Sequence, residues 1–111
     1  MKPRDVEPDE IDPAVIEQAK AEHGEITQLM VGQHPILVRC PTPEELDMFL
    51  DTVKEDTASG PALVLVTSCI VHPTAREFAQ IRRERPGCVV TILKQLRRIA
   101  GLEEDLKAKK V

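Results

Sequence analysis

The chain has 111 residues, enough for one domain with a hydrophobic core, and only 2% of them are aromatic. Because Phe49 and Phe78 are its only aromatic residues, the sequence offers no aromatic platform for stacking nucleobases or sugars. Three cysteines, the lack of an apolar leader and the lack of a membrane-length apolar run predict a soluble protein of the reducing cytoplasm, without a membrane partner.

The formal net charge of −4 conceals an asymmetry between the two halves of the chain. Residues 1–60 hold 14 acidic and 5 basic side chains, a net charge of −9, whereas residues 61–111 hold 5 acidic and 10 basic side chains, a net charge of +5. These charges could neutralise each other within one fold, or they could attract neighbouring copies head to tail. We therefore predict weak self-association that salt reduces.

The charge and proline patterns divide the chain into three regions. Residues 1–12 carry five acidic residues and two of the nine prolines, which predicts a flexible acidic arm. Residues 13–102 alternate apolar stripes with turn signals, which predicts a single helical domain. Residues 103–111 are mostly charged and predict a C-terminal tail.

The domain begins with a short helix and a hairpin. Asp12 is the expected N-cap and Pro13 the first helical residue, and His23-Gly24 ends the helix with a left-handed glycine. Residues from about 25 to 40 form two apolar segments separated by a turn signal that starts at Gly32. This pattern predicts one short β-hairpin.

The segment that follows, "PTPEELDMFLDTVKED", has the clearest helical signal in the chain. Thr42 is the predicted N-cap, Pro43 the first helical residue, and Glu45 completes a capping box. Helical spacing places four apolar side chains on one stripe, namely Leu46, Phe49, Leu50 and Val53. This stripe could receive a helix of a partner protein, or it could pack into the core.

The run "PALVLVTSCIV" over residues 61–71 is too apolar for periodicity to separate a buried helix from a buried strand. Its β-branched residues favour a strand, whereas its length of about three turns favours a helix. We predict a buried helix, which Pro73 must end because proline excludes the α conformation from the residue before it.

Two more helices are predicted to complete the domain. Thr74 caps the first, with Glu77 three residues later as the second half of a capping box. Pro86 begins the second, which runs to about Ala100, and Gly101 with the apolar residue after it predicts a Schellman closure. The fold class is therefore α+β and mainly α, a compact helical bundle with one hairpin.

Cysteine and histidine residues suggest a metal site only weakly. Cys69 and His72 are three residues apart, and Cys88, Cys40 and His34 could approach them. Structural zinc sites usually contain two closely spaced ligand pairs, and this chain has one mixed pair. A thiol within so apolar a segment is also protonated and unreactive. We predict no metal, no cofactor and no catalytic residue, so the protein is not expected to be an enzyme.

Basic residues concentrate in the last two helices. They comprise Arg76, Arg82, Arg83, Arg85, Lys94, Arg97 and Arg98. A basic patch across two helices with a short turn would suit duplex DNA, but the net negative charge of the chain weakens that interpretation. Charge complementarity within the protein or between copies remains the alternative. We identify Arg82, Arg83, Arg85, Arg97 and Arg98 as candidate partner contacts.

The order of these elements resembles the small tail assembly chaperones of long-tailed bacteriophages over residues 19–102. The motifs that carry the resemblance are the capped helix at Arg39, Pro41, Thr42 and Glu45, the corner at Cys69 and Pro73, and the helix between Pro86-Gly87 and Ala100-Gly101. The resemblance implies a mainly helical fold and a role without catalysis.

Proteins of that family coat the long, helical tape-measure protein before the tail tube forms, and they help to recruit tail tube subunits. The resemblance therefore implies those two proteins as partners, in the cytoplasm of an infected or lysogenic bacterial host. Two alternatives stay open: a structural protein that is retained in a virion or tail-like particle, and a small helical DNA-binding regulator.

Overall fold

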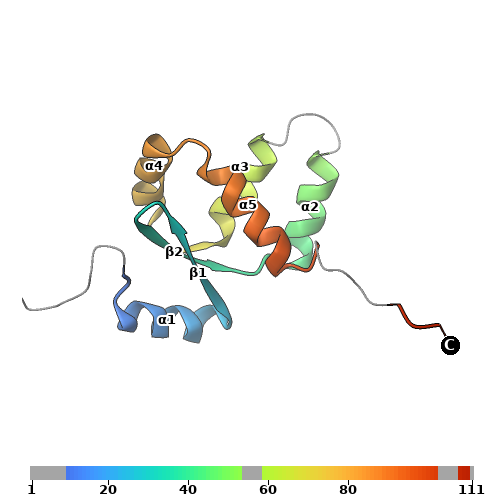
Figure 1. The fold of residues 1–111 in the computed structure, drawn as a ribbon, viewed down its shortest axis with the longest axis horizontal. Helices are drawn as coiled ribbons and strands as arrows, with labels where there is room; N and C mark the ends of the chain where they lie inside the picture. The colour runs from blue at the N-terminus through green and yellow to red at the C-terminus, as the bar shows by residue number, and fades with distance from the viewer. Residues whose placement is uncertain (1–9, 54–58, 103–107, 111) are drawn as a thin grey trace, which may run out of the picture.

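The computed structural model describes residues 10–53, 59–102 and 108–110. Along the described chain the elements are α1 (Pro13–His23), β1 (Ile26–Val31), β2 (His34–Arg39), α2 (Pro43–Val53), α3 (Ser59–Cys69), β3 (Ile70–His72), α4 (Ala75–Glu84) and α5 (Cys88–Ile99). The predicted class, α+β and mainly α, is confirmed. Figure 1 shows the small sheet beside the helices, with α2, α3 and α5 grouped on one side.

The predicted hairpin is present, but it belongs to a larger sheet. β1 and β2 pair antiparallel from Ile26 opposite Arg39 to Val31 opposite His34. Gly32, in the turn, has a φ of 63°, and a Cβ atom at this position would clash with the guanidinium of Arg85. Glycine is therefore favoured there by both the backbone and the neighbouring side chain.

A third strand corrects the prediction for residues 61–71. The helix α3 ends at Cys69, and the next three residues form β3, which pairs antiparallel with β2 in the order β1-β2-β3. Ile70 and Val71 are β-branched, and Pro73 keeps the preceding His72 out of the helical region. The chain therefore leaves α3 and adds an edge strand to the hairpin.

Local sequence signals set the helix ends. The side chain of Asp12 accepts a hydrogen bond from the Ala14 amide at 2.9 Å, as expected for an N-cap. In α4, Thr74 and Glu77 form both hydrogen bonds of a capping box. These predicted caps are confirmed.

The final helix begins later than predicted and ends as predicted. Pro86 and Gly87 form a turn, so α5 starts at Cys88. At its end Gly101 has a φ of 86°, and its amide donates to the Arg98 carbonyl at 3.0 Å. The Leu102 amide donates to the Arg97 carbonyl at 2.8 Å, which completes the Schellman motif.

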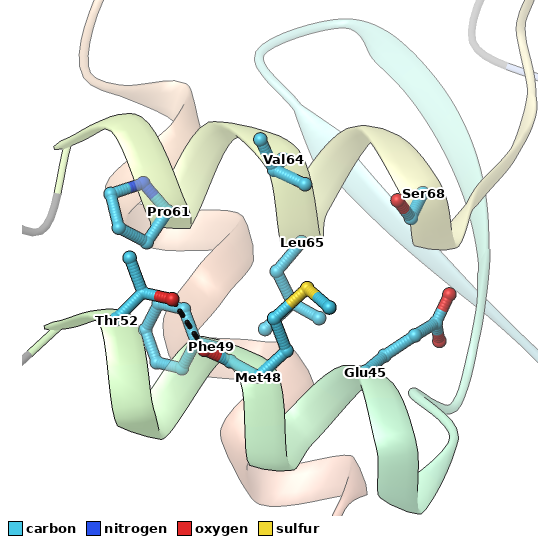
Figure 2. Close-up of a pocket in the computed structure, with 8 residues that line it drawn as sticks. All are labelled: Glu45, Met48, Phe49, Thr52, Pro61, Val64, Leu65 and Ser68. Carbon is cyan, nitrogen blue, oxygen red and sulfur yellow. Dashed lines mark hydrogen bonds between the residues drawn. The ribbon is translucent and has the colours of Figure 1, made fainter.

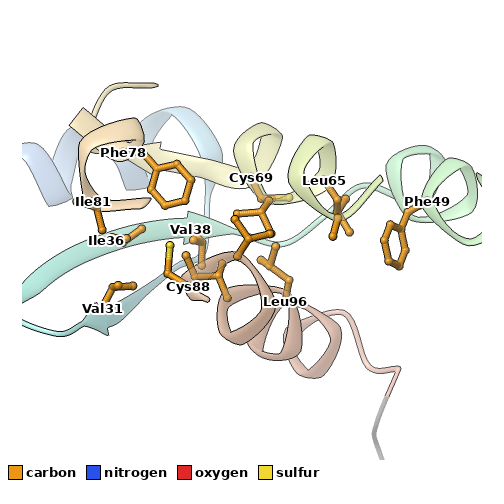
Figure 3. Close-up of a cluster of buried hydrophobic side chains, with 14 residues drawn as sticks. Val31, Ile36, Val38, Phe49, Leu65, Cys69, Phe78, Ile81, Cys88 and Leu96 are labelled. Atoms are coloured by element: carbon orange, nitrogen blue, oxygen red, sulfur yellow. The ribbon is translucent and has the colours of Figure 1, made fainter. Parts of the chain in front are cut away.

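The main core lies between the sheet and the helices α3, α4 and α5. It is built from aliphatic side chains with two cysteines and two phenylalanines, including Ile36, Val38, Phe49, Val66, Cys69, Phe78, Cys88, Ile92 and Leu96 (Figure 3). Because aromatic residues are scarce, branched aliphatic residues from β2, α3 and α5 fill most of this volume.

A second, smaller cluster covers the opposite face of the sheet. Leu37 of β2 points away from the main core and packs with Ala19 of α1 and with Ile11. Ile11 is buried, so packing begins before the predicted domain start at residue 13. The rest of the predicted acidic arm, residues 1–9, and most of the predicted tail, residues 103–107 and 111, lie outside the described residues.

Candidate functional site

An apolar groove of about 300 Å³ lies between α2 and α3. Its walls are Glu45, Met48, Phe49 and Thr52 from α2, and Pro61, Val64, Leu65 and Ser68 from α3. Each set follows the spacing i, i+3, i+4, i+7, so each helix contributes one continuous strip of its surface. Figure 2 shows the two strips facing each other, with Pro61 opposite Thr52 and Ser68 opposite Glu45.

The floor and the rims of this groove differ sharply in exposure. Phe49 and Leu65 form the floor and are only 8% and 3% exposed, because they also belong to the core. Met48 and Val64 stand on the two rims and are 68% and 61% exposed. Large apolar side chains that face each other across a groove at the surface mark a place where a partner can bury apolar area.

The hydroxyl group of Thr52 in the groove wall is satisfied by its own helix. It donates a hydrogen bond to the Met48 carbonyl at 2.7 Å (Figure 2). Thr67, outside the groove on α3, bonds in the same way to the Leu63 carbonyl at 2.8 Å. Polar groups that are already bonded within the helix do not require a hydrogen-bonding ligand, so the groove is suited to an apolar occupant.

Arg39 joins three separate segments at one end of the groove. Its guanidinium donates two hydrogen bonds to the Glu45 carboxylate, at 2.9 and 2.8 Å, and another to the Ser68 carbonyl at 2.8 Å. Both side chains of the ion pair are largely buried, 21% and 27% exposed. This bidentate arrangement connects the end of β2 to the first turn of α2 and the last turn of α3.

The same carboxylate completes the N-terminal cap of α2. Glu45 accepts a hydrogen bond from the Thr42 amide at 2.9 Å, and the Thr42 hydroxyl accepts one from the Glu45 amide at 3.1 Å. The predicted capping box of this helix is therefore confirmed. Hydrogen bonding to Arg39, and then to Thr42, lowers the pKa of Glu45 from its ordinary value of 4.5 to about 2.

The predicted stripe on α2 only partly coincides with the groove. Phe49 lines it, but Leu46 and Leu50 do not; Leu46 is half-buried and Leu50 is 37% exposed. Val53 is the last residue of α2, and its side chain lies outside the described residues. Among the described side chains of the stripe, Phe49 is the one that packs in the main core, and the groove is offset from the stripe around the helix.

The predicted arginine contacts form two groups. Arg82 and Arg83 lie in the last turn of α4, and Arg85 follows them before α5 begins. Arg97 and Arg98 lie in the last turn of α5, separated from the first group by about 14 Å of helix. All five are exposed. Figure 1 shows that α5 runs from the side of α4 toward α2, so the two groups lie at opposite ends of this helix.

Two of the three cysteines are core residues, and Cys40 is exposed. Cys69 and Cys88 are buried in the main core, and burial raises the pKa of Cys69 to about 11. Both thiols are therefore protonated near neutral pH, since burial also raises the pKa of Cys88. Within residues 10–53, 59–102 and 108–110, no three histidine, cysteine or acidic side chains are arranged to hold a metal ion. In the same ranges no helix is long and apolar enough to cross a membrane.

A family model described as a domain of unknown function (DUF6848) matches residues 19–109, well over half of the chain. The chain belongs to the DUF6848 family. The matched range contains both walls of the groove and Arg39. No curated protein matches the sequence.

One solved structure shares the fold, an uncharacterised protein, rbstp2171, from Bacillus stearothermophilus. The two chains are 19% identical, the match covers 85% of this chain and 99% of that chain, and the TM-score is 0.72. At this identity the likeness shows a common fold alone, so the function of this DUF6848 protein must be argued from its own residues.

Sequence reasoning missed Met48 and Val64 as site residues. Met48 lies between acidic residues on the side of α2 that looks like an ordinary solvent face. One signal could have found Val64: the α3 segment contains no charged residue, and its apolar residues occur on every side of the helix rather than along one stripe. A helix of that kind in a domain of this size cannot be buried on every side, so part of its apolar surface must face the solvent.

Proposed function

We propose that this protein is a non-enzymatic assembly chaperone that holds an amphipathic helix of a client protein in the groove between α2 and α3. The observation that carries the proposal is the pair of exposed side chains, Met48 and Val64, above an apolar floor. Recognition of a helix in a groove uses apolar side chains with the same i, i+3, i+4, i+7 spacing that both walls show.

The sequence resemblance to phage tail assembly chaperones supports a particular client, the tape-measure protein, with tail tube subunits as further partners. A tape-measure protein is long and helical, so it offers many successive segments to many copies of a chaperone. The groove, at about 300 Å³, accommodates only a few side chains, and each copy would bind weakly. Weak binding at many sites allows the coat to be displaced when the tube forms, in the cytoplasm of the bacterial host.

Self-association of the chaperone is the second part of the proposal. The exposed arginines at the two ends of α5 and the acidic residues of α2 give the molecule regions of opposite charge. The separation of the arginine groups does not favour a single DNA-binding face. A structural protein kept in a finished particle would use the same surfaces permanently, and it is the second candidate role.

We expect gel filtration to show an apparent mass that rises with protein concentration in low salt. The effect should disappear at about 0.5 M NaCl, where the screening length falls to about 4 Å and exposed charges attract each other only weakly. A single monomeric mass at every concentration and every salt level would contradict the self-association.

The groove itself is tested with a synthetic helical peptide and one substitution. The peptide has about 14 residues, or four turns, with leucines at i, i+3, i+4 and i+7 and glutamines beside them. Replacing Met48 with aspartate (Met48→Asp) should weaken its binding about 30-fold, because the bound peptide would bury an unpaired carboxylate. Folding should be nearly unchanged, since the Met48 side chain is 68% exposed.

Methyl-labelled methionine provides a direct measurement by NMR. The chain has three methionines, of which Met48 lies on the groove and Met30 on β1. Addition of the leucine peptide should shift the methyl resonance of Met48 and leave that of Met30 unchanged. Val90→Asp is the matched control, because Val90 is 69% exposed on α5 and does not line the groove. Equal loss of affinity in both variants, or no binding to the wild type, would refute the groove as the client site.

The client is tested by co-expression with a tape-measure protein, the long helical client that the resemblance implies. We expect that protein to stay in the soluble fraction with the wild-type chain and with Val90→Asp, and to precipitate with Met48→Asp. Precipitation with all three would contradict the chaperone role.

A further inference from the structure

The two rims of the groove differ in charge. α2 carries four acidic residues and no basic residue, and its Glu44, Asp47 and Asp51 are exposed. α3 carries no charged residue over its whole length. One side of the groove is therefore bordered by negative charge and the other side is neutral.

Helical spacing places the acidic residues at the outer edge of the α2 rim. Glu44 and Asp51 lie four residues before and three residues after Met48, so both are its neighbours on the helix surface. The equivalent neighbours of Val64 on α3 are Gly60 and Thr67. An occupant that lies between Met48 and Val64 would meet carboxylates along one flank and small uncharged groups along the other.

Glu45 does not add to this negative edge, although it lines one end of the groove. Its two carboxylate oxygens accept hydrogen bonds from Arg39, and one of them also accepts from the Thr42 amide. The charge of Glu45 is therefore compensated within the fold. The exposed carboxylates that border this rim are Glu44, Asp47 and Asp51.

We infer that the client helix carries lysine or arginine residues along one flank of its apolar stripe, and that this flank lies over α2. The uncharged polar flank then lies over α3. This inference rests on the proposed function, because it specifies the chemistry of the same client. Complementary charge would fix the direction in which the client helix lies and would increase its rate of association.

The basic helices of a second copy do not fit this description. Between them, α4 and α5 expose one large apolar side chain, Val90. Neither helix therefore offers an exposed apolar stripe to fill the groove. The occupant that matches the groove is a basic amphipathic helix of another protein.

The test compares three peptides that share one leucine stripe. They differ at the flank positions on one side of the stripe, which hold lysine, glutamine or glutamate. At low salt we expect the lysine peptide to bind about fivefold more tightly than the glutamine peptide, and the glutamate peptide about fivefold more weakly. Calorimetric titration gives the three dissociation constants.

A variant that removes two acidic residues shows whether the charge of the α2 rim causes this order of peptide affinities. In Glu44→Gln/Asp51→Asn the three affinities should converge on the value for the glutamine peptide. The control Glu17→Gln/Glu25→Gln removes two negative charges from α1 and from the residue before β1, neither of which lines the groove, and should keep the fivefold differences.

The outcomes separate the two proposals. If no peptide binds the wild type, the proposed function fails. If the three peptides bind equally well, or if the control variant loses the order as fully as the rim variant, the groove still binds a helix but the basic flank is refuted.

Discussion

Replacing Arg39 with methionine is expected to lower the free energy of unfolding by about 2 kcal/mol, the range of hydrogen bonds that involve charged groups. Methionine keeps the aliphatic stem but removes the hydrogen bonds that Arg39 donates to the Glu45 carboxylate and to the Ser68 carbonyl. Both side chains of the pair keep some contact with water, so the effect should be smaller than for a fully buried ion pair. Chemical denaturation with urea measures the difference.

Two variants define what the guanidinium contributes. Arg39→Lys keeps the charge but cannot form the bidentate pair and reach Ser68 together, so its stability should be intermediate. Arg76→Met removes an exposed arginine from α4 and should change stability by less than about 0.5 kcal/mol. Equal effects of Arg39→Met and Arg76→Met would show that the Arg39 contacts contribute nothing.

The pH dependence of stability follows from the lowered pKa of Glu45. The folded protein holds this pKa at about 2, below the ordinary value of 4.5, so the folded state binds fewer protons than the unfolded chain in this range. The contribution of the ionised Glu45 to the free energy of unfolding is complete above about pH 4.5 and declines as the pH falls toward 2. Unfolding at a series of pH values should therefore show the difference between wild type and Arg39→Met shrinking across this window.

Replacing Leu96 with alanine is expected to lower the free energy of unfolding by about 3 kcal/mol, because a buried leucine leaves a cavity. Leu96 has no exposed surface and packs in the core shared by α5, α3 and β2. Thermal and urea unfolding should both show the loss, with the secondary structure at low temperature unchanged.

Leu50→Ala is the matched control for that substitution. Leu50 is 37% exposed on α2, so the same truncation should cost less than about 1 kcal/mol. Because Leu50 does not line the groove, peptide binding should also stay unchanged. A loss as large as that of Leu96→Ala would mean that Leu50 contributes as much to core packing as Leu96 does.

The parts of the fold that were predicted correctly depend on short-range patterns. The capping boxes at Thr42 and Thr74 and the closure at Gly101 each involve residues within a few positions of one another. The hairpin was predictable because its turn and both strands are contiguous. In each case the physical partners are close in sequence, so the residues alone define the interaction.

The parts that were missed depend on distant partners. Ile70–His72 becomes a strand because β2 offers it an open edge, and β2 lies about 30 residues earlier in the chain. Arg39 donates a hydrogen bond to the backbone carbonyl of Ser68. Every residue has such a carbonyl, so the sequence gives no indication of this bond. The groove was missed because its α2 wall includes Glu45 and Thr52, which follow the pattern of a solvent-facing surface.

The contacts of Arg39 also limit how the groove can adapt to a bound helix. Because this one side chain donates hydrogen bonds to Glu45 and to the Ser68 carbonyl, α2 and α3 are held together at that end. At the other end, where Thr52 and Pro61 face each other, the chain itself connects the two helices between Val53 and Ser59. Bulky side chains of a bound helix should therefore be received by rearrangement of the exposed Met48 and Val64 side chains rather than by separation of α2 from α3.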